Sequence, residues 1–399
     1  MPTGIMTGTV LPIMMEPMLP RDDKAGMTDL AVELVAKASE LAGQIQHTAR
    51  ESIGDLVRSM NCYYSNLIEG HNTHPRDIDA ALEDKYSPDP ERRALQKEAR
   101  AHIEVQRLID NGDDPNELPV STAYIQWIHE EFCQRLPDEL LRVENPDTGA
   151  EVRVVPGNIR DGGVAVGRHI APPAADLPRF LNHFETAYTR NWPSRTRTII
   201  AAGAAHHRFL WIHPFYDGNG RVARLMSHAM LLRSGVGSSL WSISRGLARN
   251  VTEYKNRLAG ADAPRQGNYD GRGERSAAQL EKFCVFFLRT CIDQVEFMGS
   301  LLQPGELLRR MKLYTDDEEA AGRLPARSMS LLREALLMGE FARGRAPEIT
   351  GYQERRSRQI LSTLLKKGLL VSRGPRAPVR LGFPLDVVER WFPRLYPVD

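Results

Sequence analysis

The feature that most constrains this chain is the segment from His206 to Arg224, which reads HHRFLWIHPFYDGNGRVAR. An apolar helix from Thr198 to Ile212 is predicted to lead into it. Pro214 then ends that helix, because proline lacks the N–H and clashes with the preceding turn. Apolar residues at three- and four-residue spacing predict a second helix from Arg221 to Leu232. The segment is therefore predicted to be a helix, a short loop and another helix.

The end of this loop suits the binding of phosphate. Gly218, Asn219 and Gly220 expose backbone N–H groups at the start of a helix, and the positive end of the helix dipole favours anions there. Arg221 and Arg224 are three residues apart on the first helical turn. Their guanidinium groups can therefore reach the same polyphosphate.

The same loop carries one candidate metal ligand and one candidate base. Asp217 supplies the hard carboxylate oxygens that Mg²⁺ prefers. His213 has an ordinary pKa of about 6.5, which suits it to accept a proton from a hydroxyl group. Each piece alone also has a structural interpretation: a glycine-rich turn, a buried histidine, a solvated pair of arginines. Their occurrence together in one short loop indicates a catalytic site.

The run from His213 to Arg224, HPFYDGNGRVAR, resembles the Fic signature H-x-F-x-[D/E]-G-N-G-R-x-x-R at every fixed position. Fic proteins transfer AMP from ATP to a protein hydroxyl. The roles that this resemblance implies are general base for His213, Mg²⁺ ligand for Asp217, anion hole for Gly218, Asn219 and Gly220, phosphate contacts for Arg221 and Arg224, and core anchor for Phe215.

A second motif lies far upstream, at Ser65 to Gly70 (SNLIEG). Its residues predict the last turn of a helix, closed by Gly70 at the C′ position. The motif also resembles the Fic inhibitory motif [S/T]-x-x-x-E-[G/N]. In the self-inhibited class of that family the glutamate, here Glu69, pairs with the second arginine of the signature, here Arg224, and takes the place of the ATP γ-phosphate. The alternative is an ordinary exposed glutamate near a helix end.

Two further stretches resemble Fic elements. Residues 145–173 are rich in Gly and Pro, and Val164 to Ile170 alternates like a strand. This stretch resembles the Fic flap hairpin, whose edge receives the target as an added strand, and implies target contacts for Val164 and Val166. A hairpin without a partner is the alternative. Asn250 to Leu258 resembles the region that encloses adenine, with Leu258 and Tyr254 as candidates.

Composition limits the class of protein. The hydrophobic fraction of 42% and charged fraction of 26% are typical of a soluble globular chain. No apolar run approaches the about 20 residues that span a bilayer, and the N-terminus lacks the order of a signal peptide. The 4 cysteines are scattered, which favours a reducing cytoplasm and argues against a zinc site. We therefore expect a cytoplasmic protein without a membrane partner.

The predicted fold is all-α: a Fic-type helical core with a β-hairpin flap, followed by a C-terminal winged-helix domain. After Pro304 the order of helix, short helix, helix and hairpin is typical of a winged helix, and basic residues outnumber acidic ones there. One helix is expected from Asp29 to Met60. The expected domains are a disordered tail at 1–27, an N-terminal helical region with the inhibitory motif at 28–112, the Fic catalytic core at 113–302 and the winged-helix module at 303–399.

The predicted function is a protein adenylyltransferase that uses ATP and Mg²⁺, modifies Ser, Thr or Tyr hydroxyls and is inhibited by Glu69. One alternative is a transcription regulator that binds DNA through the C-terminal module and senses nucleotide with the Fic domain. Another is removal of AMP, with Glu69 positioning water. The phosphotransferase branch of the family differs at the second Gly of G-N-G, where Gly220 matches the AMP-transfer form. The target and the oligomeric state, a homodimer included, stay open.

Overall fold

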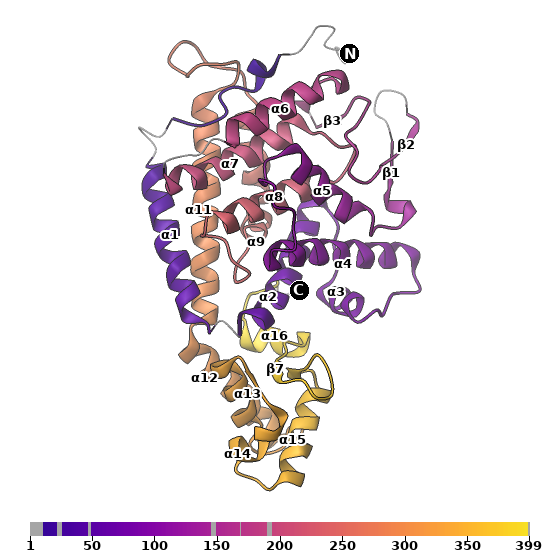
Figure 1. The fold of residues 1–399 in the computed structure, drawn as a ribbon, viewed down its shortest axis with the longest axis vertical. Coiled ribbons are helices and arrows are strands. Elements are labelled where there is room, and N and C mark those ends of the chain that lie inside the picture. The colour runs from indigo at the N-terminus through magenta and orange to yellow at the C-terminus, as the bar shows by residue number, and fades with distance from the viewer. Residues whose placement is uncertain are drawn as a thin grey trace. The chain divides into compact units, whose positions relative to one another are not determined.

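The computed structural model describes residues 11–21, 26–46, 49–144, 149–167, 169–189 and 194–397. In this part the chain is mostly helical, as predicted (Figure 1). The chain divides into two compact units, of which the first comprises Met1–Ala36, Asn61–Ser238 and Ser242–Gln294 and the second Lys37–Met60, Ser239–Trp241 and Val295–Asp399. Three helices contribute residues to both: α1 (Met27–Gln44), α2 (Arg50–Glu69) and α11 (Ala277–Leu302).

The first unit is a helical bundle around the predicted loop. Helix α7 packs against α6 and α8, and α8 packs in turn against α4 and α5. The helices with all their residues in this unit are α3 (Pro75–Leu82), α4 (Pro90–Asn111), α5 (Thr122–Cys133), α6 (Leu177–Tyr188), α7 (Arg195–Ile212), α8 (Asn219–Arg233), α9 (Ser244–Arg249) and α10 (Val251–Ala261), with short 3-10 turns η1 (Pro12–Met15), η3 (Asp138–Leu140) and η4 (Ala174–Asp176).

Two small antiparallel hairpins accompany this bundle. Strands β3 (Ala165–Val166) and β4 (His169–Ile170) form the hairpin expected at the flap, with Gly167 turning at a φ of 60°. The alternation from Val164 to Ile170 is thus divided between two strands rather than one. The sequence did not predict the other hairpin, β1 (Arg142–Glu144) with β2 (Glu151–Arg153), in which Val143 lies opposite Val152.

The disordered tail predicted at 1–27 is wrong for residues 11–21, which pack against the first unit. Met15 has no exposed surface and Met18 is 5% exposed. The Tyr188 hydroxyl donates to the carbonyl oxygen of Met18 at 2.6 Å. A segment without periodicity can still be fixed where buried donors elsewhere need carbonyl acceptors. Of the rest of that predicted tail, Met27 begins α1, and residues 1–10 and 22–25 lie outside the described part.

The single helix expected from Asp29 to Met60 is also wrong, because α1 ends at Gln44 and α2 begins at Arg50. The Arg50 guanidinium donates to the carbonyl oxygen of Ala42 at 2.6 Å. It thus satisfies one of the carbonyls that a helix leaves free at its C-terminus. The apolar stripe read from the sequence had a gap between Ile45 and Ile53, and that gap is where the helix breaks.

The second unit contains the predicted order of helix, short helix, helix and hairpin, and it adds a helix at Pro304–Ala320 before them and a strand at Glu340–Phe341. Strands β5, β7 and β6 form a three-stranded antiparallel sheet in that order. Its identification as a winged helix stays a prediction, and the unit also takes in Lys37–Met60, which the predicted boundaries did not include. The elements are α12 (Pro304–Ala320), α13 (Ser328–Met338), β5 (Glu340–Phe341), η5 (Arg343–Arg345), α14 (Ala346–Thr350), α15 (Glu354–Lys366), β6 (Leu370–Val371), β7 (Val379–Leu381) and α16 (Leu385–Trp391).

Membrane-spanning helices and the cysteines were also considered from the sequence, and both can be examined in the described residues. None of their helices is both long enough and apolar enough to cross a membrane. The cysteines are buried free thiols, Cys62, Cys133, Cys284 and Cys291.

The packing of the N-terminal segment can be tested with a matched pair of substitutions. Met15→Asp would place a carboxylate where no surface is exposed, whereas Ile13, two residues away, is 53% exposed. We expect Met15→Asp to lower the free energy of unfolding by about 2–4 kcal/mol and Ile13→Asp to leave it nearly unchanged. Urea unfolding measures both. Equal stability of the two variants would show that the segment is not packed in solution.

Candidate active site

The predicted loop runs from the end of α7 to the start of α8, and its backbone is held in an unusual shape. His213 has a φ of 50° and Gly218 a φ of 79°, both left-handed. The side chain of Asn219 closes the loop with two hydrogen bonds. Its Oδ1 accepts from the N–H of Phe215 at 3.0 Å, and its Nδ2 donates to the carbonyl of Phe215 at 2.9 Å. Asn219 therefore shapes the loop with its side chain and leaves only its backbone N–H for an anion.

Phe215 anchors the loop in the core, as the resemblance implied. Its side chain has no exposed surface, and its ring stacks on that of His129 with centroids 3.8 Å apart and planes 1° apart. His129 lies on α5, and its Nδ1 accepts the N–H of Gly157 at 2.9 Å. One buried imidazole therefore joins α5, the base of the flap segment and the loop.

Arg160 fixes the backbone around His213. This arginine is 3% exposed and follows Gly157 in the stretch PGNIR. Its Nε donates to the carbonyl of His213 at 2.8 Å, and its backbone N–H donates to the carbonyl of Pro214 at 3.0 Å. Its Nη2 donates to the carbonyl of Pro172 at 2.6 Å, beyond the flap hairpin. The left-handed turn at His213 costs free energy, and these bonds hold it in place.

The His213 imidazole is set up as a base. Its Nδ1 lies 3.3 Å from the carbonyl of Leu210, so Nδ1 carries the proton and Nε2 presents a lone pair. Burial lowers the pKa of His213 to about 4, with the nearby His169 and Arg160 acting in the same direction. The ring is therefore neutral at neutral pH and can accept a proton through Nε2.

Gly218 precedes the first turn of α8, so the helix begins at Asn219, earlier than predicted. The first N–H groups of a helix have no intrahelical acceptor and together with the helix dipole favour an anion. Gly220 has a second reason to be glycine, because a Cβ there would collide with the carboxylate of Glu69. The carboxylate of Glu69 already occupies the place where an anion would approach this helix end.

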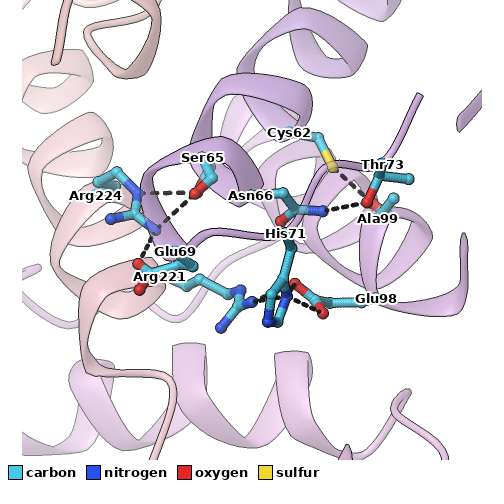
Figure 2. A network of polar contacts seen from close by, with 10 residues as sticks. All are labelled: Cys62, Ser65, Asn66, Glu69, His71, Thr73, Glu98, Ala99, Arg221 and Arg224. Atoms are coloured by element: carbon cyan, nitrogen blue, oxygen red, sulfur yellow. Dashed lines mark hydrogen bonds and ion pairs between the residues drawn. The ribbon is translucent and has the colours of Figure 1, made fainter. Parts of the chain in front are cut away.

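Figure 2 shows how Glu69 is held there. Its Oε1 lies 2.5 Å from Nη2 of Arg224, and Ser65 Oγ accepts from Nε of the same arginine at 2.8 Å. The predicted contact between Glu69 and Arg224 is therefore present. Burial alone would raise the pKa of Glu69, but the charges of Arg224 and Arg221 outweigh it and lower that pKa. The carboxylate is ionised at neutral pH.

The end of α2 presents Glu69 through the turn that the sequence predicted. Gly70 has a φ of 88°, and its N–H donates to the carbonyl of Leu67 at 3.1 Å. The N–H of His71 donates to the carbonyl of Asn66 at 2.9 Å. These two bonds form a Schellman motif with Gly70 at C′. The motif ends the helix directly after Glu69.

The two signature arginines have different partners. Arg221 is 5% exposed and hydrogen-bonds Glu98 of α4, which is 2% exposed. His71 lies 2.9 Å from the same carboxylate, and this raises the pKa of His71 (Figure 2). Arg221 is thus committed to Glu98, and its predicted role with the phosphates stays a prediction. No motif in the sequence marked Glu98.

A cavity of about 960 Å³ lies in front of His213. It is bounded by the predicted residues Glu69, His213, Gly220, Arg224, Tyr254 and Leu258, and by flap residues such as Gly167 and Ile170. Tyr254 is 3% exposed, and its hydroxyl lies 2.7 Å from Nε2 of His206, so it serves mainly as wall. Lys255, Asp262 and Arg275 also line the cavity and were not predicted.

The remaining predicted residues lie at the edges. Val164 is partly exposed beside β3, and Val166 lies in β3 with its side chain outside the described part. Asp217 is exposed on the loop. Among the described residues no group of three His, Cys, Asp or Glu could hold a metal ion. A single exposed carboxylate beside a helix N-terminus is compatible with Mg²⁺, which takes one or two protein carboxylates and completes its shell with other oxygen ligands and water.

The fold and loop together define a helical domain that presents a neutral histidine and a helix N-terminus to one cavity. The model of the Fic/DOC family matches residues 119–231. The loop from His213 to Arg224 lies within this match, so the part of the chain that carries the loop is similar to a Fic/DOC domain.

The chain is also similar to named proteins and to a solved structure. Protein adenylyltransferase Fic of Drosophila willistoni is 28% identical over 143 residues, which is 35% of this chain and 29% of that protein. The protein of the same name from Drosophila melanogaster gives the same values. The chain thus spans under a third of the length of these relatives. The crystal structure of a Fic family protein from Desulfovibrio desulfuricans G20 is 19% identical with a TM-score of 0.49, covering 89% of this chain and 96% of that one.

The protonation of His213 can be measured directly. Because burial lowers its pKa to about 4, we expect its ring nitrogens to keep the neutral Nδ1–H pattern from about pH 8 down to pH 5.5, where a free histidine is mostly protonated. Nitrogen-15 NMR of the imidazoles, with His213→Gln to assign the signal, measures this. Titration near 6.5 would contradict the buried, neutral base.

Proposed function

We propose that this chain is a protein adenylyltransferase that transfers AMP from ATP to a Ser, Thr or Tyr hydroxyl of a target protein and is inhibited by Glu69. The observation that carries the proposal is the ion pair between Glu69 and Arg224, at the helix end that faces His213 across one cavity. A carboxylate that occupies Arg224 can inhibit only if this arginine otherwise binds an anionic group of the substrate. The named relatives support transfer of AMP as the reaction.

In the proposed reaction the acceptor hydroxyl oxygen attacks the α-phosphorus of ATP. The new O–P bond forms as the bond to the β-phosphate breaks, and pyrophosphate leaves. The hydroxyl proton passes to Nε2 of His213, whose lone pair is kept free by the contact between Nδ1 and Leu210. The N–H groups of Gly220 and its neighbours at the start of α8 would stabilise the phosphate oxygens.

Mg²⁺, which neutralises phosphate charge when bound, would be held by Asp217 together with phosphate oxygens. The flap hairpin would receive the target as an added strand beside β3, where Val164 and Val166 lie. Leu258, which lines the cavity, would contact the base of ATP.

A second candidate is removal of AMP from a modified protein. It is favoured by the position of Glu69, whose side chain is 30% exposed and lines the same cavity as His213. A carboxylate there could orient a water molecule toward a bound phosphodiester. If the wild type releases AMP from a modified protein and Glu69→Gly does not, this activity is distinguished from AMP transfer.

The central test is Glu69→Gly. Arg224 cannot serve a carboxylate and a γ-phosphate at once, so removal of the carboxylate should raise AMP transfer by about tenfold or more. Labelled α-phosphate ATP with product mass analysis measures the transfer. Glu83→Gly is the matched control, because Glu83 is an exposed glutamate whose carboxylate pairs with the exposed Lys85.

Three outcomes would contradict parts of the proposal. An unchanged rate in folded Glu69→Gly removes self-inhibition. Activation by Arg224→Ala removes that arginine from ATP binding. Full activity of a Glu69→Gly, His213→Ala double variant removes His213 as the base, since a positioned base contributes about 10²–10⁴-fold.

We also propose that the second unit contacts DNA through α15. Arg355, Arg356 and Arg358 are exposed on its first turns, the usual base-contacting end of a recognition helix. A gel-shift titration of duplex DNA should show affinity that falls as salt rises, weakened by Arg355→Ala with Arg356→Ala. Absence of salt-dependent binding would remove this proposal and the regulator alternative with it.

A further inference from the structure

Arg208 is a buried charge whose partners join the N-terminal segment to the cavity wall. Its side chain has no exposed surface. Nε and Nη2 donate to the carbonyl oxygen of Pro17 at 3.1 and 2.9 Å, and Nη1 donates to the carbonyl of Ala261 at 3.3 Å. No carboxylate of the described residues pairs with it. A buried cation held by carbonyl dipoles depends on every one of them, because each lost acceptor leaves part of the charge unsatisfied.

Residues 11–18, here called the N-terminal strap, are held at several points besides Arg208. Tyr188 donates to Met18, and His183 lies 2.7 Å from the carboxylate of Glu16. The Nε of Arg275 donates to the carbonyl of Met14 at 2.8 Å. The strap thus contacts α6, α7 and the segment before α11. Gly273 completes the fit, because a Cβ there would collide with the backbone of Glu16.

The same guanidinium reaches the cavity through one histidine. Nη1 of Arg208 lies 2.9 Å from Nδ1 of His207. Arginine only donates, so Nδ1 accepts and the proton of the neutral ring lies on Nε2. That Nε2 lies 3.1 Å from Oδ1 of Asp262 and 3.1 Å from the carbonyl of Leu258. His207, Leu258 and Asp262 all line the cavity.

We propose that Arg208 is a positioning residue, which the N-terminal strap holds in place and which in turn fixes His207 and Asp262 in the wall of the nucleotide cavity. This rests on the proposed function, since it takes the cavity to bind ATP. Asp262 is the group that this chain of bonds presents to the ligand: its side chain is 27% exposed, against 1% for His207. A carboxylate of fixed orientation accepts hydrogen bonds from the amino or hydroxyl groups of a nucleoside.

The charges around His207 determine what loss of Arg208 would do. Desolvation by burial lowers the pKa of His207, Arg208 lowers it further, and Asp262 opposes both. The other groups around the pair of His207 and Asp262 are His169 on β4, whose Nδ1 lies 3.9 Å from Oδ2 of Asp262, His206 on α7, whose own pKa burial lowers to about 3, and the uncharged Phe283 on α11. Without Arg208 the pKa of His207 rises, and the ring is free to take either tautomer or to become an imidazolium that pairs with Asp262.

The experiment uses the full chain with Glu69→Gly as parent and α,β-methylene-ATP as the probe. Arg208→Met keeps the length of the side chain while removing the buried charge. Because it leaves the carbonyls of Pro17 and Ala261 without this donor, circular dichroism is used to check that the variant is folded. We expect its dissociation constant to rise by about tenfold relative to the parent at the same pH, and this ratio to be larger at pH 6 than at pH 8. Arg233→Met is the control for loss of an arginine elsewhere, because Arg233 also donates to carbonyls, of Pro115 and Glu117, and pairs with Asp114, but lies outside the cavity lining.

A variant of the strap and an NMR measurement of His207 test the positioning role independently. Met15→Asp, which displaces the strap, should weaken probe binding as Arg208→Met does, whereas Ile13→Asp should not. Nitrogen-15 NMR of His207 should show a neutral ring protonated on Nε2 in the parent and a changed pattern in Arg208→Met, whatever the ligand. An unchanged His207 signal, or equal probe affinity in folded Arg208→Met and parent, overturns the positioning role. A parent that binds no nucleotide, with the His207 change present, overturns the proposed function instead.

Discussion

The structure of the candidate site depends on the contact between the Arg160 side chain and the carbonyl of His213. A left-handed residue between two helices is what lets α7 end and α8 begin with both the imidazole and the helix N-terminus facing one space. Histidine has no glycine-like freedom to adopt a φ of 50°, so the surroundings must supply the stabilisation. Arg160 does so with its side chain and its backbone N–H, and it also reaches Pro172 beyond the flap. Base and flap are therefore positioned by one residue.

The two signature arginines illustrate how burial separates a structural ion pair from one that can be exchanged. Glu98 and Arg221 are 2% and 5% exposed, so removal of Glu98 would leave Arg221 as a buried charge without its carboxylate partner, at a cost of about 3–5 kcal/mol. Glu69 is 30% exposed at its side chain and lines the cavity, so a phosphate could replace its carboxylate on Arg224 without leaving that charge unpaired. The partly exposed pair of Glu69 and Arg224 therefore suits regulation, whereas the buried pair of Glu98 and Arg221 fixes α8 to α4.

The sequence predicted those parts of the site that lie within short motifs. The loop from His213 to Arg224 and the turn from Ser65 to Gly70 each carry their chemistry in neighbouring residues, and their contact through Glu69 and Arg224 followed from the resemblance. Glu98, Arg160 and Arg208 could not be found in this way, since their partners are carbonyls or side chains far away in the chain. The N-terminal strap shows the same limit: backbone acceptors leave no mark on residue type, and Met and Pro without periodicity suggested a mobile tail.

The charges of Glu69 and Arg224 also limit how this ion pair can be broken. The pKa of Glu69 is lowered in the folded chain, so the pair contributes stability above the ordinary glutamate pKa of about 4.3 and loses it only as the pH falls through the lower folded value. Between pH 6 and 8 the carboxylate of Glu69 therefore stays charged, and a guanidinium group does not lose its proton in this range. Changes of pH near neutrality cannot open the site by titrating this pair. Release must come from an anion that competes for Arg224, or from a movement of the end of α2 that withdraws Glu69.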